Sequence, residues 1–179
     1  MNTKKNGADA EYMFKIILVG DGAVGKSSLI RKYMEGKFES DYLPTIGSQI
    51  YTKTLSNRTH RKVKLVVWDI SGQPVFGIVR PDYYKGATGV LLVFDLTRPE
   101  TYSHLDGWVE EIRKNTSKPE IIVIGNKSDL EVDRKVSRKS GEAYASKVNG
   151  SYLETSAKGG NNVEKTFSDL ADRLVENIH

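Results

Sequence analysis

The sequence predicts an α/β fold in which helices cover both faces of a mostly parallel sheet. Apolar segments of strand length alternate along the chain with segments of helical periodicity. Two of the apolar segments, Val90–Leu96 and Ile121–Ile124, are nearly continuous, which is typical of strands buried on both faces. A glycine-rich segment also joins the first expected strand to the first expected helix, as at phosphate-binding sites in this fold class.

The composition is that of one globular domain. The chain has 179 residues, a net charge of +4 and no cysteine. The charge is too small to argue for nucleic acid, and the lack of cysteine excludes disulfides, thiol zinc sites and thiol catalysis. No apolar run approaches the roughly 20 residues of a transmembrane helix, and the polar N-terminus does not resemble a signal peptide. We expect residues 1–12 to form a disordered leader and residues 13–179 to form the domain.

The first half of the chain alternates strands with irregular segments. Two strand-like segments joined by a short polar link predict an antiparallel hairpin, whose basic tip we interpret as solvated, with an acidic partner or membrane as the alternative. In order, we expect a strand over Phe14–Val19, a helix ending near Glu35-Gly36, a loop over Lys37–Gly47, strands over Ser48–Leu55 and Val63–Asp69, and a loop over Ile70–Pro81.

The second half reads as buried strands separated by amphipathic helices. Pro99 fits the first turn of a helix, and Ser137 caps another that stops at Asn149-Gly150. A short strand over Ser151–Glu154 follows, and Asn161 with Glu164 resembles a capping box that opens the last helix. We expect the apolar stripe of that helix to pack in the core, with a partner surface as the alternative: Val163, Phe167, Leu170, Leu174 and Ile178.

The segment Gly20-Asp21-Gly22-Ala23-Val24-Gly25-Lys26-Ser27 fits the phosphate-loop pattern G-x-x-x-x-G-K-[ST]. Small residues let backbone N–H groups surround a phosphate. Lys26 can reach the terminal phosphates, and the Ser27 hydroxyl suits Mg²⁺, which prefers oxygen ligands. The alternative, a flexible glycine-rich turn, is disfavoured because a strand precedes the segment and a helix follows it.

Further polar groups are expected at the same edge of the sheet, because ligands bind at the carboxyl ends of parallel strands. Asp69 ends a strand and can contribute to the coordination shell of a Mg²⁺ ion, and Gly72 offers a backbone N–H group to a terminal phosphate. The alternative for Asp69 is that it caps a helix or a turn. The segment Asn126-Lys127-Ser128-Asp129 contains a carboxylate that can accept hydrogen bonds from the N1–H and the exocyclic amine of guanine. Adenine does not present this pair of adjacent donors, so such a site would select guanine. A plain Asn/Asp turn is the alternative there.

Together these motifs resemble the Ras superfamily of small GTPases, and most closely its Rab branch. The resemblance covers about residues 13–178. It implies a P-loop NTPase three-layer sandwich, with a six-stranded sheet that is parallel except for one antiparallel edge strand. The Rab-like segments are Pro44-Thr45-Ile46-Gly47, Trp68-Asp69, Tyr83–Gly89 and Phe94-Asp95-Leu96-Thr97.

The resemblance implies a GTP hydrolase that cycles between GTP and GDP, with Mg²⁺ as cofactor and Gln73 orienting the attacking water. Residues Lys37–Gly47 and Ile70–Pro81 resemble switch I and switch II, whose order depends on the γ-phosphate. The resemblance implies that the phosphates bind to the backbone N–H groups of Gly22, Ala23, Val24, Gly25, Lys26, Ser27, Ser28 and Gly72. It implies that Mg²⁺ binds to Ser27 and Thr45 directly and to Asp69 through a water molecule. The residues that it implies for the base are Phe38, Asn126, Lys127, Asp129, Ser156, Ala157 and Lys158.

The chain departs from the family pattern in switch II. The family usually has Asp-Thr-Ala-Gly-Gln-Glu, whereas this chain has Asp69-Ile70-Ser71-Gly72-Gln73-Pro74. Pro74 restricts Gln73 to extended conformations, which either fixes the glutamine well or holds it away from the water. Two hypotheses stay open: a slowly hydrolysing switch, or a GTP-binding interaction module with little hydrolysis. A different P-loop class, such as an ATP-dependent kinase, is disfavoured by the Asn126–Asp129 motif.

The resemblance also implies partners and a location. We expect a monomeric G domain that binds effector, exchange-factor and GTPase-activating proteins at the switch segments. We expect it to act in membrane traffic or signalling and not to bind nucleic acid. Rab proteins usually carry prenylated cysteines in a C-terminal tail, but this chain ends at Ile178-His179 with none. Either this sequence lacks such a tail or the protein has no lipid anchor, and the sequence alone does not decide between these alternatives. We expect a cytoplasmic protein, with peripheral contact at the cytosolic face of a membrane as an open alternative.

Overall fold

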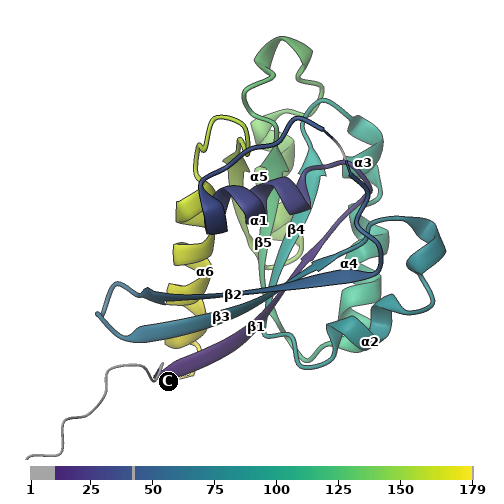
Figure 1. The fold of residues 1–179 in the computed structure, drawn as a ribbon. Helices are drawn as coiled ribbons and strands as arrows, with labels where there is room; N and C mark the ends of the chain where they lie inside the picture. Colours follow the sequence, from purple (N-terminus) through teal and green to yellow (C-terminus); the bar gives the residue numbers. More distant parts are fainter. Residues whose placement is uncertain (1–10, 42, 179) are drawn as a thin grey trace, which may run out of the picture.

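The structure, a computed structural model, describes residues 11–41 and 43–178. Strands and helices alternate as the sequence predicts (Figure 1). The strands are β1 (Tyr12–Val19), β2 (Ser48–Ser56), β3 (Lys62–Ile70), β4 (Gly89–Asp95), β5 (Glu120–Asn126) and β6 (Ser151–Thr155). The helices are α1 (Lys26–Glu35), α2 (Arg80–Tyr84), α3 (Pro99–Ser103), α4 (Leu105–Asn115), α5 (Arg138–Lys147) and α6 (Val163–Glu176), with 3₁₀ turns at Pro74–Phe76 and Glu131–Asp133.

The strands form one six-stranded sheet in the order β2-β3-β1-β4-β5-β6. Only the β2–β3 pair is antiparallel, and the other pairs are parallel. This confirms the predicted sheet, its antiparallel edge strand and the hairpin. Because β1, β3, β4, β5 and β6 run in one direction, their carboxyl ends meet at one edge of the sheet.

The core consists of two apolar layers, one on each face of the sheet. Successive residues of β1 alternate between them: Ile16 and Leu18 pack toward α1 and α6, whereas Ile17 and Val19 pack toward α2, α4 and α5. This alternation is the two-residue period of a strand with both faces buried. The three-layer arrangement predicted from the sequence is therefore confirmed.

Replacing Phe167 with alanine is expected to lower the free energy of unfolding by about 3–5 kcal/mol, because a large cavity would form in the core. Phe167 is 1% exposed and its ring stacks on Tyr33 with centroids 3.9 Å apart. Chemical denaturation measures the change. Ile178→Ala is the control, because Ile178 is 52% exposed and should change stability little. Equal losses in both variants would contradict this assignment of the core.

The structure corrects several predicted boundaries. Most of the predicted leader (residues 1–12) lies outside the described residues, but Tyr12 already belongs to β1, where it pairs with Val63. The helix after Pro99 is divided into α3 and α4 by a turn at His104. The predicted loop over Ile70–Pro81 contains the end of β3, a 3₁₀ turn and the start of α2.

Two predictions about the last helix are wrong. Asn162, not Asn161, is the N-cap residue, and no side chain caps the helix. The Asn162 side chain instead donates to the Glu154 carbonyl at 2.8 Å, so the capping box is absent. Ile178 lies beyond the end of α6 and is exposed, so it does not extend the buried stripe.

The basic hairpin tip between β2 and β3 is partly anchored. Arg58 forms ion pairs with Asp169 at 3.0 Å and with Asp172 at 2.8 Å, both on α6. His60 and Lys62 are exposed, as predicted for a solvated tip. The hairpin is therefore fastened to the helix that covers one face of the sheet. Across the described residues, no helix is long and apolar enough to cross a membrane.

Candidate functional site

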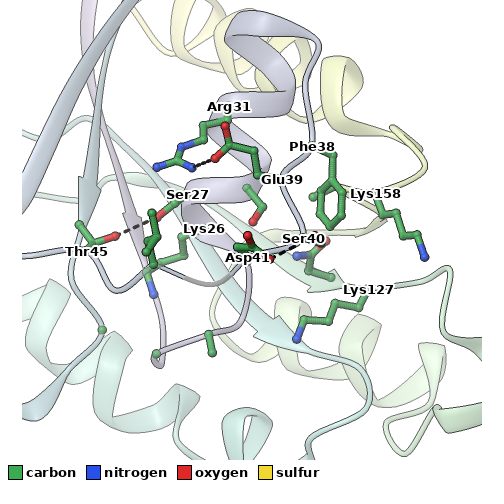
Figure 2. A pocket seen from close by; sticks show the side chains of 18 of the residues that line it. Lys26, Ser27, Arg31, Phe38, Glu39, Ser40, Asp41, Thr45, Lys127 and Lys158 are labelled. Atoms are coloured by element: carbon green, nitrogen blue, oxygen red, sulfur yellow. Dashed lines mark hydrogen bonds and ion pairs between the residues drawn. The ribbon is translucent and has the colours of Figure 1, made fainter.

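A cavity of about 430 Å³ opens at the edge where the parallel strands end (Figure 2). Loops that follow β1, β3, β5 and β6 surround it, together with the segment after α1. The predicted site residues that line it are Gly22, Ala23, Gly25, Lys26, Ser27, Ser28, Phe38, Thr45, Gly72, Gln73, Asn126, Lys127, Asp129, Ala157 and Lys158.

Three predicted residues lie behind the cavity wall. The side chain of Val24 belongs to the core beside α1 and α6. Asp69 and Ser156 are both fully buried. Their side chains reach the cavity through neighbours, because Asp69 accepts a hydrogen bond from Ser27 and Ser156 donates one to Asp129.

The phosphate loop directs a buried ammonium group into the cavity. The Nζ atom of Lys26 donates to the carbonyl oxygens of Gly20 and Asp21, each at 2.7 Å. Burial lowers the pKa of Lys26 to about 8, while the charges of Asp69 and Asp21 oppose that shift. An anion in the cavity would restore the favourable environment that burial has removed.

The same loop is packed too tightly for side chains. Gly25 has a φ of 100°, and a Cβ atom there would lie 2.2 Å from Asn126 Nδ2. A Cβ atom on Gly72 would lie 2.2 Å from the Gly20 carbonyl oxygen. Glycine is therefore required at both positions, and the backbone of switch II lies directly against the phosphate loop.

Two hydroxyls and a carboxylate meet at one end of the cavity. Ser27 Oγ lies 2.5 Å from Asp69 Oδ2 and 2.9 Å from Thr45 Oγ1, and Thr45 lies 3.3 Å from Asp69 Oδ2. The second oxygen of Asp69 is buried and, among the described residues, has no hydrogen-bond partner. Burial raises the pKa of this carboxyl, against the opposing hydrogen bond from Ser27 and the charge of Lys26.

This donor set fits a magnesium ion. All of its atoms are oxygens, which Mg²⁺ prefers, and the buried carboxylate oxygen lacks a partner. Among the described residues, no cluster of three His, Cys, Asp or Glu side chains could hold a metal. An ion at this end of the cavity would therefore rely on one carboxylate, that of Asp69, together with hydroxyl groups, water and ligand phosphates. Mg²⁺ is usually bound by one or two carboxylates with waters and phosphates.

Asn126 joins the phosphate loop to the other end of the cavity. Its Nδ2 donates to the Val24 carbonyl at 2.9 Å, and its Oδ1 accepts from Thr155 Oγ1 at 2.9 Å. Asp129 lines the cavity and accepts from Ser156 Oγ at 2.7 Å through Oδ1. No hydrogen bond from the described residues reaches Asp129 Oδ2, which leaves this oxygen able to accept from a ligand.

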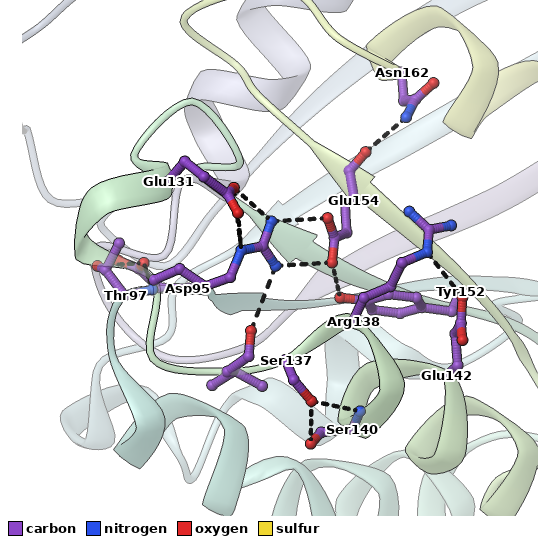
Figure 3. Close-up of polar contacts among 12 residues, drawn as sticks. Asp95, Thr97, Glu131, Ser137, Arg138, Ser140, Glu142, Tyr152, Glu154 and Asn162 are labelled. Atoms are coloured by element: carbon purple, nitrogen blue, oxygen red, sulfur yellow. Dashed lines mark hydrogen bonds and ion pairs between the residues drawn. The ribbon is translucent and has the colours of Figure 1, made fainter.

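Ion pairs brace the loops around Asp129. The fully buried Asp95 holds Lys127 Nζ at 2.6 Å, so the side chain of Lys127 runs along the cavity wall. Arg134, which follows this loop, pairs with Glu131 and with Glu154 of β6, each at 3.0 Å. Figure 3 shows the carboxylates of Glu131 and Glu154 directed toward each other. The segment after β5 is therefore fixed against strand β6.

Sequence reasoning missed part of the cavity wall. Arg31 and Glu39 both line the cavity and form an ion pair at 2.6 Å (Figure 2). Arg31 lies four residues after Ser27, on the same face of a helix, so helical spacing was the available signal. Glu39 lies in an irregular segment, where no spacing rule predicts the direction in which a side chain points. Ser71, one of the departures from the family pattern, also lines the cavity.

The backbone of Gln73 is extended, with φ −74° and ψ 137°, as expected before a proline. Its N–H donates to Ser71 Oγ at 3.4 Å, and its residue lines the cavity. Pro74 therefore does not remove Gln73 from the cavity.

The comparisons with known proteins agree with this geometry. The family model described as the Ras family matches residues 15–176. The chain belongs to the Ras family. Ras-related protein RABA4a of Arabidopsis thaliana is 42% identical over 170 residues, which are 94% of this chain and 75% of the relative. RABA4b of the same plant is 39% identical, with the same coverage.

Ras-related protein Rab-21 of Bos taurus is 38% identical over 94% of this chain and 76% of the relative. These Ras-family relatives carry Rab names, which confirms the resemblance to that branch. As a Ras-family small GTPase, the chain is a guanine-nucleotide-binding switch protein and a GTP hydrolase.

Proposed function

We propose that this chain binds GTP with Mg²⁺, hydrolyses it slowly through Gln73, and recruits partners through switch I and switch II in the GTP state. The observation that carries the proposal is that the phosphate loop, with Ser27, shares one cavity with Thr45, Gln73 and Asp129. Asp69 lies behind the wall of this cavity and accepts a hydrogen bond from Ser27. That arrangement supports phosphates near Lys26 and a guanine base near Asp129.

Each group has a chemical task in this proposal. Lys26 and the backbone N–H groups of the phosphate loop neutralise and orient the phosphates. Gln73 orients the attacking water. Asp129 Oδ2 accepts from the base, while Phe38, Lys127 and Ala157 enclose it. A bound Mg²⁺ would stabilise the charge on the phosphate oxygens, with Ser27, Thr45 and Asp69 as the residues that hold it.

Partner binding is supported by the exposed apolar side chains of the two switch segments. Leu43 and Ile46 in switch I and Val75 and Ile78 in switch II are each at least 68% exposed. Exposed apolar groups gathered near one site are typical of protein–protein contacts. We propose effectors, exchange factors and activating proteins as the partners, and membrane traffic or signalling as the process, since the relatives carry Rab names.

Phosphate release from GTP tests this function. In the proposed function, purified protein with Mg²⁺ releases phosphate at a rate on the order of 10⁻⁴ per second without a partner. The alternative, a GTP-binding module with little hydrolysis, is favoured by Ser71 and Pro74 beside Gln73. It predicts tight GTP binding with no turnover, either alone or with an activating protein. Equal affinity for ATP and GTP would contradict both.

Removal of Mg²⁺ is expected to accelerate GDP release by about 10-fold or more, because a bound ion would stabilise the negative charge of the phosphates. Dissociation of a fluorescent GDP analogue, with and without a chelator, measures the change. The Ser27→Ala variant should release GDP quickly with and without the chelator. Ser28 lies outside the hydroxyl cluster, so the chelator should still accelerate GDP release from the Ser28→Ala variant. If the chelator does not change the rate at which the unmodified protein releases GDP, the proposed metal site is contradicted.

A further inference from the structure

Arg80 is a buried cation in switch II whose contacts the proposed function does not use. It is only 8% exposed at the start of α2. Its Nε and Nη2 atoms donate to the two carboxylate oxygens of Glu111 on α4, at 2.9 and 3.1 Å. The guanidinium group also lies 4.5 Å from the ring centre of Trp108, one helical turn before Glu111. This bidentate pair over an aromatic ring fixes the guanidinium in one orientation.

The third nitrogen of the Arg80 guanidinium is directed at Gln73. Nη1 donates to the Gln73 carbonyl oxygen at 3.1 Å. At the other end of the same residue, the Gln73 N–H donates to Ser71 Oγ. Pro74 restricts the intervening backbone to the extended conformation that Gln73 adopts. Both peptide groups of Gln73 are therefore held, and the residue lines the cavity.

Helix α4 also holds the phosphate loop. Trp108 Nε1 donates to Asp21 Oδ1 at 2.8 Å, and His104 Nδ1 lies 2.7 Å from Asp21 Oδ2. Asp21 precedes the residues of the phosphate loop that line the cavity. One rigid helix thus sets the position of both the phosphate loop and the backbone of Gln73.

We infer that Arg80 and Glu111 are positioning residues for GTP hydrolysis, which hold the backbone of Gln73 at a fixed place relative to the phosphate loop. This inference rests on the proposed role of Gln73. Neither residue lines the cavity, so they act through Gln73 and not on the nucleotide.

The inference also explains how the chain accommodates Pro74. A proline after the glutamine removes one backbone donor and limits the conformations that the glutamine can explore. With the Arg80 contact, the restricted conformation is one in which Gln73 lies at the cavity. The 3₁₀ turn has hydrogen bonds of its own, from the Phe76 N–H to the Gln73 carbonyl at 3.1 Å and from the Gly77 N–H to the Pro74 carbonyl at 2.9 Å. The Arg80 contact adds a link from the Gln73 carbonyl to Glu111 on α4.

Single-turnover GTP hydrolysis tests the inference, with GDP affinity measured on the same proteins. Glu111→Gln keeps the size of the side chain but removes its charge, and Arg80→Lys keeps the charge but cannot form the bidentate pair. We expect either change to slow hydrolysis by about tenfold or more, because small displacements of a positioned group are costly. GDP affinity should be unchanged, since neither residue contacts the cavity.

A control and a double mutant separate positioning from general stability. Glu110→Gln removes an exposed partner of Lys114 on the same helix and should leave hydrolysis unchanged. In a Gln73→Leu background, Glu111→Gln should cause no further loss, because the group that it positions is gone. A merely structural role would lower GDP affinity, or would slow hydrolysis by the same factor in both backgrounds.

The outcomes distinguish the two proposals. If Gln73→Leu slows hydrolysis but Glu111→Gln and Arg80→Lys do not, the positioning inference is wrong and the role of Gln73 stands. If Gln73→Leu hydrolyses GTP as fast as the unmodified protein, the role of Gln73 is wrong, and the inference is overturned with it. If Arg80→Lys is unstable, the result for Glu111→Gln alone decides whether the positioning inference holds. This variant should stay folded, because the glutamine amide can still accept a hydrogen bond from Arg80.

Discussion

Asp129→Asn is expected to lower the affinity for GTP by about 10³-fold or more, because a site built to hydrogen-bond one base rejects a ligand that leaves buried groups unpaired. Asp129 Oδ1 is already bonded to Ser156, so Oδ2 is the oxygen available to guanine N1–H and the exocyclic amine. An amide presents a donor in place of one acceptor, which opposes the donors of guanine. Xanthine has a carbonyl where guanine has the amine, so the variant should gain affinity for xanthosine triphosphate.

Competition against a fluorescent GDP analogue, with GTP, ATP and xanthosine triphosphate, measures this change. Asp133→Asn is the matched control, because Asp133 is exposed in the following 3₁₀ turn and does not line the cavity. It should bind GTP as the unmodified protein does. Undiminished GTP affinity in Asp129→Asn would place the base elsewhere.

Lys26→Ala is expected to lower GTP affinity by about 10²–10³-fold, because hydrogen bonds to charged groups contribute roughly 1.5–3 kcal/mol each. The ammonium group is buried and oriented by the carbonyls of Gly20 and Asp21, so it is already placed for an anion. Its lowered pKa, about 8, shows that burial disfavours its charge, which bound phosphates would stabilise.

Equilibrium binding of GTP and GDP measures the loss, and thermal unfolding of the unliganded protein shows whether the variant still folds. Lys32→Ala is the control on the same helix, because Lys32 lies outside the cavity. A folded Lys26→Ala protein that binds GTP normally would contradict the placement of the phosphates at this loop.

Much of the fold and site could be predicted because the decisive residues are close together in the sequence. The Gly20–Ser27 segment and the Asn126–Asp129 segment are continuous motifs, and each follows an apolar strand. Since the carboxyl ends of parallel strands share one edge, the motifs were expected to meet, and they line one cavity.

The remaining contacts could not be predicted because they join residues far apart in the sequence. Arg80 and Glu111 are separated by 31 positions, and no local pattern marks them as a pair. The capping box failed for a similar reason, since the Asn162 side chain bonds to Glu154 on the preceding strand. Ile178 continues the apolar periodicity, but α6 ends at Glu176 and leaves it in solvent.

The most direct test of the central claim is single-turnover hydrolysis of GTP with Mg²⁺ by the unmodified protein and by Gln73→Leu. If Gln73 orients the water despite Pro74, the unmodified protein should turn over slowly and the variant should be slower by about tenfold or more. GTP affinity should be the same in both. Equal inertness of the two proteins, with GTP tightly bound, would contradict the hydrolysing switch and favour the interaction module.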